Sequence, residues 1–209
     1  MKLWQAVAMM AAFVVAVGVV LFLWWDLDVR WRPHDVTKAS DQLAQQLAAA
    51  GWVSMGGGGA NKVYLVAVRD CRPCAAFESG EIPALGKAGA DVRVIMVDPN
   101  DASSTAPERA TVAELWVNRG RPLLQAWLAA DAKTWTAPGV PPADGDAART
   151  AVVQASRTLA DSVRAIARQN GFPLAYPLVV WRAKDGTLEA AAGNCPKTWR
   201  YVEKDVAAH

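Results

Sequence analysis

Two cysteines separated by two residues, Cys71 and Cys74, are the part of this sequence best suited to chemistry. The chain has one other cysteine, Cys195, and three are too few for a disulfide-stabilised scaffold. A CxxC pair in this setting is typical of dithiol redox chemistry or of metal binding. The two histidines, His34 and His209, lie near the chain ends, so most histidine-based sites lack their residues. We assign no role to Cys195.

The elements on either side of the pair predict how the two sulfurs are presented. A continuous apolar and β-branched run, residues 62–68, precedes Cys71 and predicts a buried strand. The residues after Cys74 predict a helix that Pro83 bends or ends. Cys71 then lies at a helix N-terminus, where unpaired amides and the helix dipole stabilise a thiolate, so it is predicted as the attacking sulfur. Cys74, one turn later, is predicted to resolve the mixed disulfide. Pro73 suits a first helical turn.

The remaining pattern predicts one α/β domain with a helical insertion. Residues 91–98 predict a second strand, parallel to the first, because strand, helix and strand in this order pack in this way. Helical spacing recurs over residues 107–133, with a break near 120–122, and over 148–169. The chain closes with a strand at 178–181, a hairpin turn at 184–187, a strand at 188–191 and a helix at 197–207.

The first 25 residues predict a membrane anchor. No charged residue occurs from Leu3 to Trp25, and about 23 residues at ~1.5 Å each extend about 34 Å, enough to cross the hydrocarbon core. A cleaved signal peptide is the alternative, but the apolar stretch exceeds the usual length and no A-x-A-like cleavage site precedes Asp26. The expected divisions are a transmembrane anchor at 1–25, a juxtamembrane linker with a short helix at 26–59, and an α/β domain at 60–209 whose insertion covers about 102–170.

Composition and local context exclude several kinds of ligand. Twenty-two Lys plus Arg against 20 Asp plus Glu give a net charge of +2, and no basic run is present that would follow a phosphate backbone, so we predict no nucleic acid partner. Two thiolates alone fall short of a structural zinc site. Ala75 follows Cys74 where covalent haem attachment requires a histidine. The sequence therefore predicts no metal and no cofactor.

With these elements in place, the chain resembles the thioredoxin superfamily, and within it the thiol-disulfide oxidoreductases of the bacterial envelope, especially the disulfide isomerase class. The resemblance covers about residues 60–205. It rests on Cys71-Arg72-Pro73-Cys74, on Tyr176-Pro177 before an apolar strand, and on the long helical insertion between them. It implies an α/β thioredoxin-like fold with a helical insertion; the apolar stretch Leu3–Trp25 adds one transmembrane helix before it. It also implies catalytic roles for Cys71, Cys74 and a cis Pro177, and substrate contacts from Tyr176, Arg72 and Pro73.

Some features depart from that family. An anchor takes the place of the N-terminal dimerisation domain of the periplasmic isomerases. Leu65 stands six residues before Cys71, where cytoplasmic thioredoxins carry a buried Asp, and Tyr176 stands where the family usually has Thr or Val. Asp70 disfavours a neighbouring thiolate and Arg72 favours one, so the direction of electron flow stays open.

The resemblance implies a membrane-anchored thiol-disulfide oxidoreductase or isomerase. Its expected partners are client proteins with cysteines, a membrane or periplasmic redox partner, and the lipid bilayer through residues 3–25. The expected location is the bacterial inner membrane, crossed once, with the C-terminal domain in the periplasm. Two alternatives stay open for the same cysteines: a redox-inactive scaffold of an envelope assembly, and a Cu(I) metallochaperone, since soft thiolates suit Cu(I).

Overall fold

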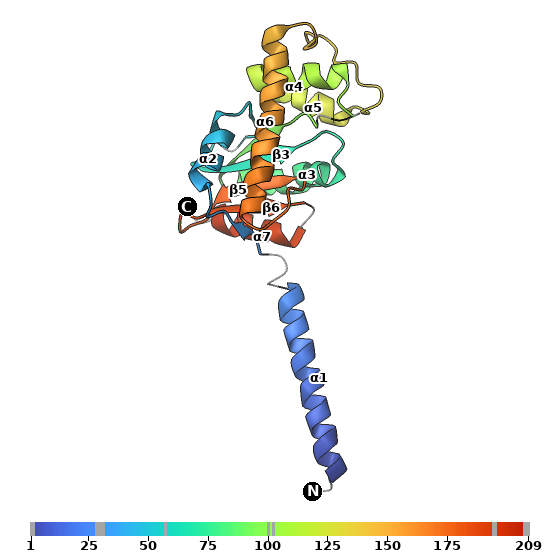
Figure 1. Ribbon diagram of the computed structural model, residues 1–209, viewed down its shortest axis with the longest axis vertical. Coiled ribbons are helices and arrows are strands. Elements are labelled where there is room, and N and C mark those ends of the chain that lie inside the picture. The colour runs from blue at the N-terminus through green and yellow to red at the C-terminus, as the bar shows by residue number, and fades with distance from the viewer. Residues whose placement is uncertain are drawn as a thin grey trace. The chain divides into compact units, whose positions relative to one another are not determined.

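A computed structural model describes residues 3–27, 32–56, 58–99, 101, 103–193 and 196–206. It divides into two units, residues 1–32 and 33–209, which are described separately (Figure 1). The first unit holds one helix, α1 (Leu3–Leu27). Its window Met9–Asp26 has a mean hydropathy of 2.1 and none of it is buried, so α1 is long and apolar enough to cross a membrane.

The second unit is built around a six-stranded sheet in the order β1-β6-β5-β3-β4-β2. The strands are β1 (His34–Asp35), β2 (Val53–Ser54), β3 (Asn61–Ala67), β4 (Ala90–Met96), β5 (Leu178–Arg182) and β6 (Leu188–Ala192). β3 and β4 are parallel, and every other neighbouring pair is antiparallel. The helices are α2 (Ser40–Ala49), α3 (Arg72–Lys87), α4 (Ala106–Asn118), α5 (Arg121–Ala129), α6 (Ala147–Gln169) and α7 (Pro196–Val206).

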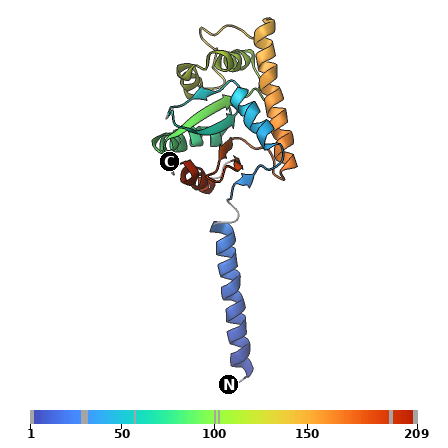
Figure 2. The ribbon, with the colours of Figure 1, turned by 90° about the vertical axis from the view of Figure 1, so that its left-hand side faces the viewer.

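Helices cover both faces of the sheet, with α2 and α6 on one side and α3 and α7 on the other (Figure 2). The sequence of β3 dictates this arrangement, because alternate residues of a strand point to opposite faces. Val63 and Leu65 pack in the cluster under α3, whereas Tyr64 and Val66 pack in the cluster under α2 and α6. A strand buried on both faces reads as a continuous apolar run, which is the pattern that predicted β3.

The inner strand order β4-β3-β5-β6, with helices α3 and α7 on one face, is the thioredoxin-like arrangement that the sequence predicts. The two central strands, the two hairpin strands and the helices of the insertion lie within a few residues of their expected positions. Asp146 caps α6 by accepting hydrogen bonds from the amides of Ala148 and Arg149, at 2.9 and 3.0 Å. The α/β fold class is confirmed.

Two expectations differ from the structure. Residues from Pro33 onward belong to the folded unit, whereas the sequence suggested a juxtamembrane linker with a short helix at 26–59, outside the α/β domain; the short helix is present as α2. This segment supplies both edge strands, and α2 buries Leu43 and Leu47. Pro83 does not end the helix, because α3 runs through it to Lys87. Burial of Ile82 and Leu85 on the sheet offsets the backbone hydrogen bond that proline cannot donate.

Candidate functional site

Cys71 and Cys74 form a disulfide where β3 passes into α3. Cys71 is the N-cap of α3, and its Sγ accepts a hydrogen bond from the Cys74 amide at 3.1 Å. The Cys71 carbonyl accepts bonds from the amides of Cys74 and Ala75, at 2.9 and 3.2 Å. No acidic residue occupies the first turn of α3. When the bond is reduced, this amide and the helix dipole favour the thiolate form of Cys71.

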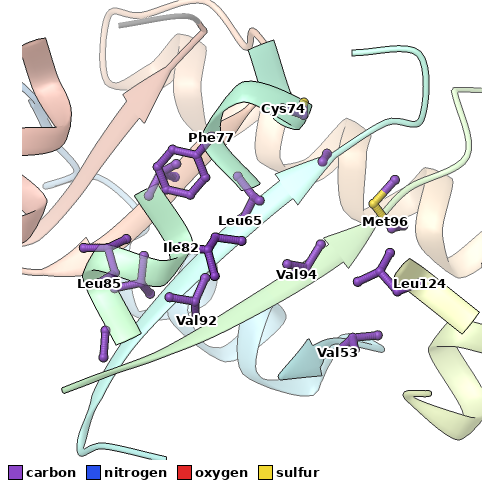
Figure 3. Close-up of a cluster of buried hydrophobic side chains, with 14 of the residues drawn as sticks. Val53, Leu65, Cys74, Phe77, Ile82, Leu85, Val92, Val94, Met96 and Leu124 are labelled. Carbon is purple, nitrogen blue, oxygen red and sulfur yellow. The ribbon is translucent and has the colours of Figure 1, made fainter. Parts of the chain in front are cut away.

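The two sulfurs differ in access to solvent. Cys71 is 9% exposed and Cys74 is 2% exposed. Cys74 belongs to the same buried cluster as Leu65 of β3 (Figure 3). Arg72 is exposed and Pro73 is partly exposed in the first turn between them. An incoming sulfur therefore meets Cys71 first, as the order of the two cysteines on the helix predicts.

Pro177 reaches the same end of the sheet from the other half of the domain. It directly precedes Leu178, which pairs with Val66 near the end of β3. The peptide bond between Tyr176 and Pro177 is cis, as expected, and the Pro177 carbonyl accepts a hydrogen bond from the Gly193 amide at 2.9 Å. Burial raises the pKa of the Tyr176 hydroxyl, although part of this side chain stays exposed.

Arg69, two residues before Cys71, ties the motif to the helical insertion. Its guanidinium donates to Glu108 on α4 and to the carbonyl of Ala130 after α5, both at 2.9 Å. The charged carbon lies 5.3 Å from the ring centre of Trp127 and 5.6 Å from that of Trp135. Burial raises the pKa of Glu108, and the nearby Arg69 opposes this shift. The sequence reasoning missed this anchor because its two charged members are far apart along the chain.

A second ion pair joins the end of β4 to the insertion. Asp98, whose side chain is fully buried, accepts hydrogen bonds from the Arg157 Nε of α6 at 2.7 Å and from the Ser104 hydroxyl. A cavity of about 470 Å³ opens beside this pair. Val68 after β3 and Tyr176 before Pro177 both line it, so a hollow begins next to the loops that carry the disulfide and the cis proline.

The structure thus brings the predicted site residues to one end of the sheet. Arg72, Pro73 and the two cysteines come from one turn, and Tyr176 and Pro177 come from the loop before β5. Cys195 lies outside the described residues. Within the described part of the chain, no group of three or more His, Cys, Asp or Glu side chains is arranged to hold a metal ion.

Comparisons with known proteins give only distant likenesses. No family model matches the chain, and no curated protein sequence matches it. Among solved structures, it is similar to the catalytic domain of Proteus mirabilis ScsC (15% identity, TM-score 0.47, covering 81% of this chain and 99% of that one). It is also similar to Salmonella enterica Typhimurium BcfH (17%, 0.48, covering 97% and 91%) and to the thiol-disulfide exchange protein alpha-DsbA2 from Wolbachia pipientis (15%, 0.43, covering 82% and 94%). At these scores the fold assignment rests on the strand order described above.

Proposed function

We propose that this chain is a thiol-disulfide oxidoreductase that exchanges disulfides with cysteine-bearing client proteins outside the cytoplasm, held at the membrane by α1. The observation that carries the proposal is the Cys71–Cys74 disulfide at the N-terminus of α3. Its more exposed sulfur is held by a helix amide, and the second sulfur is buried one turn behind it. This arrangement supports attack and resolution by two different thiols.

In the proposed reaction, the Cys71 thiolate attacks a client disulfide, forms a mixed disulfide and releases one client thiolate. Cys74 then attacks Cys71 Sγ, which closes the internal disulfide and releases the second client thiolate. The client gains two electrons and the protein loses two. The reverse sequence oxidises a client dithiol, and the return of a client thiolate before closure gives isomerisation. Tyr176 and Pro177 are proposed to contact the client beside the cysteines.

The central test is trapping by single-cysteine variants. Cys74→Ala keeps the attacking sulfur but lacks the resolving one, so we expect it to accumulate reducible high-mass adducts after acid quenching. Cys71→Ala should accumulate at least about tenfold less, because Cys74 is almost fully buried. Non-reducing gels compare the two variants at equal expression. Equal trapping by both, or none by either, would contradict the proposal.

Membrane attachment and orientation have separate tests. An uncleaved α1 places the full-length protein in the membrane fraction, whereas a soluble form that begins after residue 25 would identify α1 as a signal sequence. An alkaline phosphatase fused to the C-terminus should be active if the domain lies outside the cytoplasm. An abundant but inactive fusion would place the domain on the other side.

A further inference from the structure

The central strands β3 and β5 separate at the end of the sheet opposite the disulfide. They pair at three positions, and the last pair toward this end is Tyr64 with Val180. β3 extends back to Asn61, where it is still paired with β4. β5 extends forward to Arg182, where it is still paired with β6. The sheet therefore divides between β3 and β5 beyond their last pair, and we call this gap the fork.

Local contacts hold the two strands of the fork apart. The Asn61 side-chain amide donates a hydrogen bond to the carbonyl of Val206, the last residue of α7, at 3.1 Å. Gly59, just before β3, lies so close to Gly89 that an added Cβ would be 1.7 Å from the Gly89 carbonyl oxygen. Both contacts fix the start of β3 beside β4 and α7. On the other side, the Arg182 guanidinium donates to a carbonyl of its own hairpin turn at 2.9 Å.

A cavity of about 370 Å³ opens in the fork. This volume is within the range of small-molecule sites. The walls are mostly apolar and come from both faces of the sheet, with Leu47 and Tyr64 on one face and Trp181 and Val206 on the other. All four side chains are buried. Two of them carry aromatic rings, which suit a flat apolar ligand.

Two cations, Lys62 and Arg182, stand at the mouth of this cavity, and both are exposed. Continuation of the register from the Tyr64–Val180 pair places them opposite each other across the fork, on the face that carries α2. Lys62 has no hydrogen bond or ion pair within the described part of the chain. Arg182 faces one acid, Asp41, at 4.0 Å, and that side chain is 89% exposed. An anion between the two cations would relieve their repulsion.

Glu189 and Asp205, two acids of the same end, lie on the other face of the sheet. Glu189 pairs with Trp181 in the register of β5 and β6, and the Trp181 indole donates to Asp205 of α7. Trp181 packs in the cluster under α3, and directly opposed residues of neighbouring strands share a face. The sheet thus separates these acids from Lys62 and Arg182, so the mouth of the cavity is locally cationic.

We propose that the fork binds a small aromatic carboxylate, with its ring against Tyr64 and Trp181 and its carboxylate between Lys62 and Arg182. The aromatic walls favour a ring, and the planar guanidinium matches the geometry of a carboxylate. A single negative charge is favoured over a double one because Asp41 lies at the same mouth. The site uses neither cysteine of the disulfide, so it goes beyond the proposed exchange reaction.

Calorimetric titration of 2-naphthoate into the full-length protein tests the proposal, in maltoside detergent with protein-free micelles as the blank. We expect saturable binding at one site. The uncharged 2-naphthamide keeps the ring but gains no charge-assisted contact with Lys62 or Arg182, so it should bind at least about tenfold more weakly.

Substitutions in the cavity should separate the role of charge from that of space. Lys62→Gln and Arg182→Gln should each weaken naphthoate binding about three- to tenfold and leave naphthamide binding unchanged. Lys184→Gln is the matched control, because it removes an exposed cation two positions from Arg182 that does not line the cavity. It should change neither affinity. Ala44→Phe places a ring in the cavity from α2 and should weaken both probes more than about tenfold.

The position of the site, away from the disulfide, gives the last check. Cys74→Ala should bind naphthoate as tightly as the parent does. Loss of binding in Cys74→Ala would place the probe at the disulfide end and overturn the proposal. No saturable binding, equal affinity for naphthoate and naphthamide, or an equal loss in Lys184→Gln would overturn it too. Each of these outcomes leaves disulfide exchange untouched, because client trapping tests that function separately.

Discussion

At the end of the sheet that carries the disulfide, Glu108 and Asp98 each bind an arginine, whereas at the opposite end Glu189 lies among three aspartates. Arg69 and Arg157 neutralise the first two acids. Burial first, and then the charges of the nearby aspartates, Asp205, Asp35 and Asp185, together raise the pKa of Glu189 to about 7. The difference teaches that the acids paired with arginine, Glu108 and Asp98, hold the loops at the disulfide end in place. At the far end, Glu189 makes stability depend on pH.

Removal of an arginine at the disulfide end should have the largest effect on stability. Arg69→Met leaves Glu108 buried without its ion-pair partner, since the two side chains are only 7% and 11% exposed. We expect the free energy of unfolding to fall by about 3 to 5 kcal/mol. Urea unfolding of the parent and of Arg69→Met at pH 7 measures this fall. Addition of Glu108→Gln in the same chain should recover part of the loss, and a loss below about 1 kcal/mol would show that the pair does not anchor the motif.

Replacement of Glu189 at the far end should raise the free energy of unfolding, whereas replacement of Arg69 lowers it. Glu189 has a folded pKa of about 7 against 4.5 in the unfolded chain, so the unfolded state loses its proton first. Stability therefore falls between about pH 4.5 and pH 7. Because Glu189 is only partly buried, solvent screening reduces the full linkage energy, and we expect Glu189→Gln to be more stable than the parent by about 1 to 2 kcal/mol at pH 8, and equal to it at pH 4.

Urea unfolding of Glu189→Gln and of the parent at pH 4, 6 and 8 measures how the difference in stability depends on pH. Glu78→Gln should show the same sign, because burial gives Glu78 the same folded pKa. This dependence of stability on pH is therefore shared by Glu78 on α3 and by Glu189 on β6. An equal gain for Glu189→Gln at pH 4 and pH 8 would rule out titration as the cause.

The smallest expected effect comes from Asp205, which accepts a hydrogen bond from the Trp181 indole at 3.0 Å. Asp205→Asn keeps an acceptor for the indole and removes one negative charge near Glu189. The pKa of Glu189 should fall, and stability at pH 8 should change by less than about 1 kcal/mol. Carboxyl-carbon NMR titration reads the shift directly. An unchanged pKa of Glu189 would remove Asp205 from the acidic group.

Sequence patterns predicted the central strands and the long helices because each runs long enough for its period to be visible. The CxxC position at the start of α3 followed from the same reasoning. The two-residue edge strands carry no period, and the pairing of His34 with Ala190 joins residues far apart in the chain. Residues 26–59 were therefore assigned to a linker with a short helix outside the domain, although the structure packs the part from Pro33 onward into the domain.

The ion pair between Arg69 and Glu108 could not be predicted from the sequence for a related reason. Arg69 and Glu108 are 39 positions apart, and their pairing depends on how the insertion folds back over the end of β3.

The short length of β1 and β2 limits how other chains can pair with the edges of the sheet. An exposed sheet edge is a template on which a strand of another chain can form, and long flat edges promote aggregation. Here each edge strand is only two residues long, Pro33 precedes β1, and Asp35 places a charge on it. If this chain exchanges disulfides as proposed, its cysteine-bearing clients find little free backbone on the sheet edges with which to pair.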